Sequence, residues 1–191
     1  MHVAVDGAWA GLVALADEVR PEAVGTIRDL RAAGVSPVLL TGDSAETARA
    51  VAGRVGVAEV VPRCLPQDKL EYVARSEGEG IPVCMVGDGV NDAPALRRAF
   101  VGVAMGGVGS DIAMDAADVV LVDDAVGELP HLVELSHHMM RVIRANLTFS
   151  MGLNLVAVVL AVTGVMGPVV GALVHNAGSV LVISCSALLL G

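Results

Sequence analysis

Residues 85–96 read Met85-Val86-Gly87-Asp88-Gly89-Val90-Asn91-Asp92-Ala93-Pro94-Ala95-Leu96. This stretch overlaps the end of an apolar run, Ile81 to Val86, that is typical of a buried parallel strand. The glycine-rich turn behind the run carries two carboxylates and a carboxamide, and such oxygen ligands suit a hard divalent cation. Open α/β folds bind ligands beyond the carboxyl ends of their strands. The stretch therefore predicts a magnesium and phosphate site, not a turn whose Asp and Asn serve only the backbone.

A second polar turn supports this prediction. Thr41-Gly42-Asp43 follows the apolar run Val35 to Leu40 in the same way. The Thr41 hydroxyl and the backbone amides at Gly42 are suited to binding phosphoryl oxygens. Two such turns indicate phosphoryl transfer, in which the protein positions the transferring group and neutralises its charge.

Residue type suggests a role for each side chain of the glycine-rich turn. Asp88 is the candidate for direct Mg²⁺ coordination. Asn91 can donate a hydrogen bond to the phosphoryl group. Asp92 can hold the water shell of the metal or orient its neighbours.

The string Gly87 to Leu96 resembles the catalytic half of the P-type cation-transporting ATPases, within the haloacid dehalogenase-like superfamily. Thr41-Gly42-Asp43, with Thr47-Ala48, is similar to that family's TGD motif and the helix after it. Leu65 to Lys69 is similar to the segment that carries its phosphate-contacting lysine. The resemblance covers essentially the whole chain. It implies Mg²⁺ and ATP as cofactors, and it makes Lys69 a phosphate-binding charge and not an ordinary solvated lysine.

The sequence lacks the Asp-Lys-Thr-Gly-Thr motif on which P-type ATPases form an aspartyl phosphate. The actuator domain with its TGE loop and the nucleotide-binding insertion are also absent from it. The resemblance therefore implies a C-terminal part of a pump, with the missing N-terminal half as partner and ATP bound by the missing nucleotide domain. We expect the chain to be catalytically inactive by itself.

Charge divides the chain into two regions. Every Asp, Glu, Lys and Arg lies at or before Arg144, so the last 47 residues carry no charge except one that His175 could bear. Two apolar spans, Ala145–Met166 and Pro168–Leu190, are long enough to cross a membrane as a helical hairpin. We expect three regions: a phosphorylation domain over 1–130, a connecting helix over 131–144, and two transmembrane helices over 145–191.

The expected hairpin contains polar residues that could contact a transported cation. Polar side chains inside a membrane pack inward and often mark an ion path. The transported-ion candidates are Asn154, His175, Asn176, Ser179 and Cys185. His175 and Asn176 are similar to the last membrane helix of the heavy-metal-translocating subgroup. Zinc and cadmium pumps of that subgroup tend to carry lysine where this chain has Asn154, so cobalt, manganese and copper stay open as cargo.

Strands and helices alternate through the region before the hairpin. Apolar runs and turn signals predict a hairpin around Asp6-Gly7, with strands over 3–5 and 12–15. A doubly wound, Rossmann-like α/β domain with a mainly parallel sheet follows. After the hairpin, the helices are expected at 21–33, 44–55, 67–77, 93–99 and 110–116. The strands are expected at 35–40, 59–61, 81–86, 101–104 and 119–122.

The net charge of −9 argues against a nucleic-acid partner. We expect an integral protein of a bacterial plasma membrane, in contact with lipid and with its catalytic part in the cytoplasm. Two alternatives stay open. One is a membrane-anchored phosphatase of the same superfamily, which would need an Asp-x-Asp pair where Asp6 stands alone. The other is a non-catalytic subunit or fragment that joins membrane partners through its hairpin.

Overall fold

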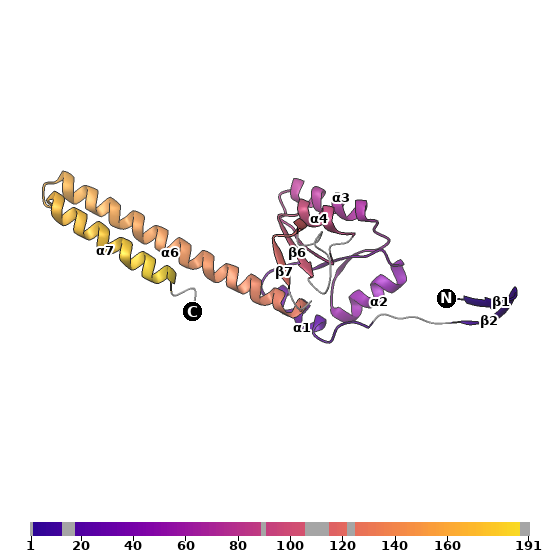
Figure 1. Ribbon diagram of the computed structural model, residues 1–191. Coiled ribbons are helices and arrows are strands. Elements are labelled where there is room, and N and C mark those ends of the chain that lie inside the picture. The colour runs from indigo at the N-terminus through magenta and orange to yellow at the C-terminus, as the bar shows by residue number, and fades with distance from the viewer. Residues whose placement is uncertain (1, 13–17, 89–90, 106–114, 122–124, 188–191) are drawn as a thin grey trace. The chain divides into compact units, whose positions relative to one another are not determined.

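The computed structural model describes residues 2–12, 18–88, 91–105, 115–121 and 125–187. The chain divides into two compact units, Met1–Pro130 and His131–Gly191. Figure 1 shows that the first unit holds the strands and shorter helices, whereas the second consists of two long helices. The expected helix over 110–116 and parts of the glycine-rich turn, Gly89 and Val90, lie largely or wholly outside the described residues.

The chain starts with a β-hairpin. Strands β1 (His2–Val5) and β2 (Ala8–Leu12) pair antiparallel, with Val5 opposite Ala8. Asp6 and Gly7 between them have φ angles of 50° and 79°. Two positive φ angles define the tight turn whose twist matches that of the strands, so the predicted hairpin is confirmed. The second strand begins earlier than expected, because the turn uses only two residues.

A βαβ unit carries the first polar turn. Helix α1 (Ala23–Ala32) precedes β3 (Val38–Leu40), which is followed by α2 (Ala45–Val55) and β4 (Glu59–Val61). Strands β3 and β4 are parallel, with Leu39 opposite Val60. The Ser44 side chain caps α2 by accepting from the Thr47 amide, and Gly56 ends the helix with φ 84°. These contacts hold the 41–44 turn at the carboxyl end of β3.

A second parallel sheet carries the glycine-rich turn. Helix α3 (Pro66–Gly78) leads to β5 (Cys84–Gly87), α4 (Ala93–Arg98), β6 (Val101–Met105) and β7 (Val119–Leu121). The strand order is β5-β6-β7, all parallel. Strand β5 begins at Cys84 and not at Ile81, whose side chain is 58% exposed. Pro82 has no amide hydrogen for a ladder, which accounts for the later start.

The strands do not join into the single sheet that the sequence predicts. The α/β fold and its parallel pairing are confirmed, but β3-β4 and β5-β6-β7 are separate ladders. In the described part of the chain, β3 is bonded only to β4, and β5 only to β6. Each of these strands therefore keeps one unpaired edge.

A small core supports the glycine-rich turn. Val73 of α3, Met85 of β5, and Ala95 and Leu96 of α4 form a buried cluster, and Leu40 packs against it. Gly102 of β6 allows α4 to come close, since a Cβ there would lie 2.6 Å from the Leu96 carbonyl oxygen. The start of α4, with Asp92, is thereby held next to the end of β5.

The second unit consists of α6 (Leu129–Val162) and α7 (Pro168–Ala187), after the short 3₁₀ turn η1 (Val126–Glu128). The expected connecting helix and first span form one continuous helix that ends at Val162 and not at Met166. In the described part of the chain, the segment Val126–Val162 is long and apolar enough to cross a membrane, and Val169–Ser184 is a shorter apolar helix. The two helices lie side by side (Figure 1).

Candidate phosphate and metal sites

The turn after β3 is organised by its own side chains. Thr41 Oγ1 donates a hydrogen bond to Asp43 Oδ2 at 2.9 Å and accepts one from the Asp43 amide at 3.2 Å. Gly42 and Asp43 are exposed, whereas Thr41 is half-buried. The threonine hydroxyl is thus held at the carboxyl end of β3, where the sequence places a phosphoryl contact.

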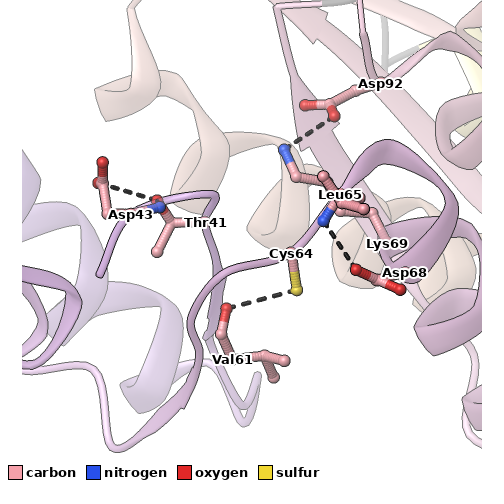
Figure 2. Close-up of polar contacts among 8 residues, drawn as sticks. All are labelled: Thr41, Asp43, Val61, Cys64, Leu65, Asp68, Lys69 and Asp92. Atoms are coloured by element: carbon pink, nitrogen blue, oxygen red, sulfur yellow. Dashed lines mark hydrogen bonds and ion pairs between the residues drawn. The ribbon is translucent and has the colours of Figure 1, made fainter. Parts of the chain in front are cut away.

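The loop around Cys64 ties this turn to helix α3. The Cys64 amide donates to the Thr41 carbonyl at 2.9 Å, and the Arg63 amide donates to the Asp43 carbonyl at 2.9 Å. Cys64 is buried, and its thiol donates to the Val61 carbonyl at 3.4 Å. Figure 2 shows the Cys64 loop between Thr41 and Lys69. The two candidate phosphate-binding segments are therefore connected through backbone hydrogen bonds.

A hydrogen bond to the Asp68 side chain fixes the start of helix α3, which carries Lys69. Asp68 Oδ2 accepts from the Leu65 amide at 2.8 Å, and the Lys69 amide donates to the Leu65 carbonyl at 3.1 Å. Burial raises the pKa of the Cys64 thiol, and the nearby Asp68 carboxylate raises it further, whereas the Lys69 charge lowers it. The thiol is therefore a neutral packing group at ordinary pH and not a nucleophile.

Lys69 and Asp92 form the most enclosed ion pair among the described residues. Lys69 Nζ lies 2.8 Å from Asp92 Oδ1, and their side chains are 17% and 9% exposed (Figure 2). The lysine is thus neither solvated nor free. A buried carboxylate needs a counter-charge or hydrogen-bond donors, and here the Lys69 ammonium supplies both.

The end of β5 explains why glycine occupies position 87. A Cβ on Gly87 would lie 2.8 Å from Asp92 Oδ2 and 3.0 Å from Asp92 Cβ, so the Asp92 side chain packs directly against the Gly87 backbone. Asp88 and Asn91 are exposed. Neither has a hydrogen-bond partner among the described residues. Asp88 is therefore the open carboxylate of the turn, and Asp92 the enclosed one.

Two of the polar candidates in the second unit, Asn154 and His175, contact each other between the two helices. His175 Nδ1 lies 3.3 Å from Asn154 Oδ1, and Asn146 Nδ2 donates to Ser186 Oγ at 3.0 Å. Ser179 Oγ donates to the His175 carbonyl within α7 at 3.0 Å. Asn176 is exposed and has no partner among the described residues. Cys185 belongs to α7, but its side chain lies outside the described part.

The haloacid dehalogenase-like hydrolase family matches residues 2–99, which contain the Thr41 turn, Lys69 and the glycine-rich turn. The chain belongs to this family. The haloacid dehalogenase-like α/β fold that the motifs imply is thereby confirmed for this part of the chain. The matched range thus contains both the Lys69–Asp92 pair and the Thr41 turn, which lies at the carboxyl end of β3.

Similar proteins cover nearly the whole chain. It is 44% identical over 98% of its length to a manganese-exporting P-type ATPase of Mycobacterium leprae, and 41% identical over 86% to a probable cadmium-transporting ATPase of Staphylococcus aureus. The crystal structure of a zinc-transporting PIB-type ATPase in its E2·Pi state superposes with a TM-score of 0.88 at 36% identity, covering 97% of this chain and 30% of that one. The chain spans about a quarter of the length of its curated relatives, 26% and 23% for the two named here.

The donor set of this haloacid dehalogenase-like domain fits Mg²⁺. Asp88 offers an unpaired, exposed carboxylate at the end of β5, and oxygen ligands with several retained waters are the usual Mg²⁺ environment. Asp92 Oδ1 is already bonded to Lys69. Asp88 therefore fits direct coordination, and Asp92 fits the support of Lys69 and of the water shell. Among the described residues, no group of three His, Cys, Asp or Glu side chains gathers as a metal site, either at this turn or elsewhere.

Sequence reasoning missed the Cys64 loop. Nothing in its composition marks it, because its role lies in backbone hydrogen bonds to Thr41 and Asp43. The signal that was available is the Leu65-x-x-Asp68 spacing, which predicts a helix start directly after Cys64. Asp6, which the phosphatase alternative would need as part of an Asp-x-Asp pair, has the positive φ of a turn residue.

Proposed function

We propose that this chain supplies the magnesium and phosphate site and two membrane helices of an ATP-driven exporter of a transition-metal cation. The observation that carries the proposal is the enclosed Lys69–Asp92 pair next to the exposed Asp88 carboxylate, with the Thr41 turn tied to the start of the lysine helix. Such an arrangement offers a positive charge held in place, a hydroxyl and an open carboxylate. Phosphoryl transfer needs these groups.

Each of these side chains would have its own role in phosphoryl transfer. The Gly42 amide would donate to an oxygen of the phosphoryl group. The Thr41 hydroxyl, which here donates its one hydrogen to Asp43, would turn that hydrogen to the same group, while the Asp43 amide still donates to Thr41 Oγ1. Lys69 neutralises negative charge on the same group, and Asp92 holds the ammonium in position. Asn91 donates a further hydrogen bond. Asp88 would hold Mg²⁺, which would supply positive charge next to the transferring group.

The phosphate-accepting carboxylate would come from a segment outside this sequence, on an Asp-Lys-Thr-Gly-Thr motif, and ATP would be bound by a nucleotide domain that is also outside it. Within the part of the chain that the structure describes, β3 and β5 each have one unpaired edge, and these edges support this proposal. A further parallel strand bonded to both edges would end between the Thr41 turn and Asp88. Its own C-terminal residue would then face both phosphate-binding elements.

The helices α6 and α7 would cross a bacterial plasma membrane as a hairpin. Arg141 and Arg144 precede the uncharged part of α6, and the connection from Thr163 to Gly167 carries no basic residue. Positive residues stay on the cytoplasmic side, so the site domain would lie in the cytoplasm. Lipid would then contact the exposed apolar side chains of both helices.

The cargo would pass the polar contacts between the helices. The His175 imidazole, the Asn154 and Asn176 amides and the Ser179 hydroxyl would offer nitrogen and oxygen ligands to a divalent transition metal, and Cys185 would add a thiol. The similarity to a manganese exporter favours manganese as the first cation to test. Zinc and cadmium follow, because other similar pumps are named for them.

A two-polypeptide assay tests the proposal. The chain is co-expressed with the Asp-Lys-Thr-Gly-Thr half of a heavy-metal P-type ATPase, and membranes are labelled with γ-³²P-ATP. We expect no acid-stable label on either part alone, and a hydroxylamine-sensitive label on the other half when both are present. Asp88→Asn should abolish this label, whereas Glu71→Gln, an exposed carboxylate of α3 outside the site, should leave it intact. Normal labelling in Asp88→Asn would refute the assignment of the magnesium ligand.

A further inference from the structure

The contact between Asn154 and His175 determines which nitrogen of the imidazole is free. The Asn154 carboxamide oxygen lies 3.3 Å from His175 Nδ1, and both residues lie in the uncharged part of the chain. An amide oxygen is only an acceptor, so the imidazole must carry a hydrogen on Nδ1 to form this bond. A neutral imidazole has one N–H, which leaves Nε2 with its lone pair.

Close packing of the helices places these two residues opposite each other. Gly178 is buried, and a Cβ there would collide with Leu153 Cδ2. Leu153 is the neighbour of Asn154, and Gly178 lies one helical turn from His175. The missing side chain at position 178 therefore allows the helices to approach where the Asn154 amide reaches the imidazole.

We propose that Asn154 is a positioning residue that holds His175 as the Nδ1–H tautomer and so makes Nε2 the atom that binds a divalent transition-metal cation in transit. A metal-binding histidine generally donates its other N–H to an oxygen acceptor, which fixes the ring and strengthens the ligand. Here the acceptor comes from the neighbouring helix. The bond between α6 and α7 would thus couple the spacing of the two helices to the orientation of the ligand.

The metal part of this inference rests on the proposed function, but the tautomer does not. If the Asn154 amide were turned around, its N–H would donate to Nδ1, the proton would sit on Nε2, and that nitrogen could not bind a metal. The two orientations therefore predict opposite tautomers. The distinction can be measured without any transport activity.

Nitrogen NMR of the full chain in lipid nanodiscs separates the two cases. The histidines are labelled with ¹⁵N, the spectra are taken at about pH 8, where an ordinary imidazole is neutral, and His175→Ala identifies the signals of His175. We expect a protonated Nδ1 in the wild type and in Asn154→Asp, which keeps an oxygen acceptor. Asn154→Leu should lose this state. Asn146→Leu is the matched control, since it removes the other interhelical bond and should leave the His175 signals unchanged.

Binding of Mn²⁺ and Co²⁺ to the same variants tests the role of Nε2. We expect Asn154→Leu to weaken binding about 10-fold, with Asn154→Asp and Asn146→Leu near the wild type. A protonated Nε2 in the wild type, or a tautomer unchanged in Asn154→Leu, would overturn the positioning role. Equal metal binding by wild type and His175→Ala would instead remove His175 from the proposed transport path while leaving the measured tautomer in place.

Discussion

The phosphate site and the helix pair use polar groups in opposite ways. In the first unit, a positive and a negative side chain face each other at 2.8 Å, and both are largely enclosed by protein. In the second unit, the contacts between α6 and α7 join neutral groups, Asn146 with Ser186 and Asn154 with His175, in a region without Asp, Glu, Lys or Arg.

The difference fits the surroundings that we propose for each region, protein for the first unit and membrane for the helix pair. A folded α/β domain can enclose a charge when a partner of opposite sign and the backbone replace its water. A helix surrounded by hydrocarbon has no water to replace, so a neutral hydrogen bond costs much less there than an ion pair. We therefore expect single substitutions to have large effects at the Lys69–Asp92 pair and small ones between the helices.

The largest effect is expected from breaking the ion pair. Lys69→Met leaves the Asp92 carboxylate enclosed without a counter-charge, which costs about 3 kcal/mol. Amide hydrogen exchange of α4 and β5 in the full chain should then accelerate about 100-fold. The double variant Lys69→Met/Asp92→Asn should recover most of the loss, since it removes both charges.

A matched control for this variant is Arg28→Met. The Arg28–Asp29 pair has the same 2.8 Å contact, but its side chains are 78% and 50% exposed. No change in exchange is expected there, because water screens the pair. If Lys69→Met also left hydrogen exchange unchanged, the Lys69–Asp92 pair would not stabilise the fold. The expected difference between the ion pair and the interhelical contacts would then be wrong.

Two glycine-to-alanine substitutions compare how tightly the two units are packed. We expect both to cost less stability than breaking the ion pair. In Gly102→Ala, the new Cβ meets the Leu96 backbone carbonyl, which cannot move aside without shifting α4, so we expect a loss of about 2 kcal/mol. In Gly178→Ala, it meets only the tip of the Leu153 side chain, and a rotamer change relieves this at about 1 kcal/mol. Hydrogen exchange of β6 and α7 in the two variants gives both values. A larger loss for Gly178→Ala would mean that the helix pair is the more rigid unit.

A smaller effect is expected for the second interhelical hydrogen bond. Asn146→Leu removes the bond to Ser186 and should cost only about 0.6 kcal/mol, since polar contacts between membrane helices are weak on average. Unfolding of the helix pair in SDS, measured as a cycle with Ser186→Ala, isolates the pair energy. An interaction above about 2 kcal/mol would contradict the weak-contact interpretation.

The smallest effect concerns the pH dependence of Cys64. Its folded pKa is raised, mainly by burial, so the folded chain keeps the thiol proton to higher pH than the unfolded chain. Its stabilising contribution is complete below the unfolded thiol pKa of about 8.5, and is lost as the pH rises through the folded value. The rate of iodoacetamide alkylation against pH measures this. Asp68→Asn should shift the curve to lower pH, because that carboxylate raises the pKa.

Local patterns predicted most of the elements. The strand at Glu59–Val61 is confirmed at its predicted bounds, and the start of α2 after Ser44 follows from a side chain that caps its own helix. Such features depend on a few neighbouring residues. The bounds of β2, β5 and α6 differ from prediction. The start of β2 depends on the length of the turn before it, the start of β5 on Pro82, and the extent of α6 on the helix continuing past Arg144.

The sequence alone was enough to identify the family, the alternation of strands and helices, and the uncharged C-terminal region, because motifs, periodicity and charge are local properties of the chain. Only the tertiary structure decided that Lys69 pairs with Asp92, that Cys64 ties the Thr41 turn to α3, and that Asn154 meets His175. It also decided that the parallel strands form two ladders. These pairings join residues far apart in the sequence. They depend on how whole elements pack, such as α4 over Gly102 and Leu153 against Gly178.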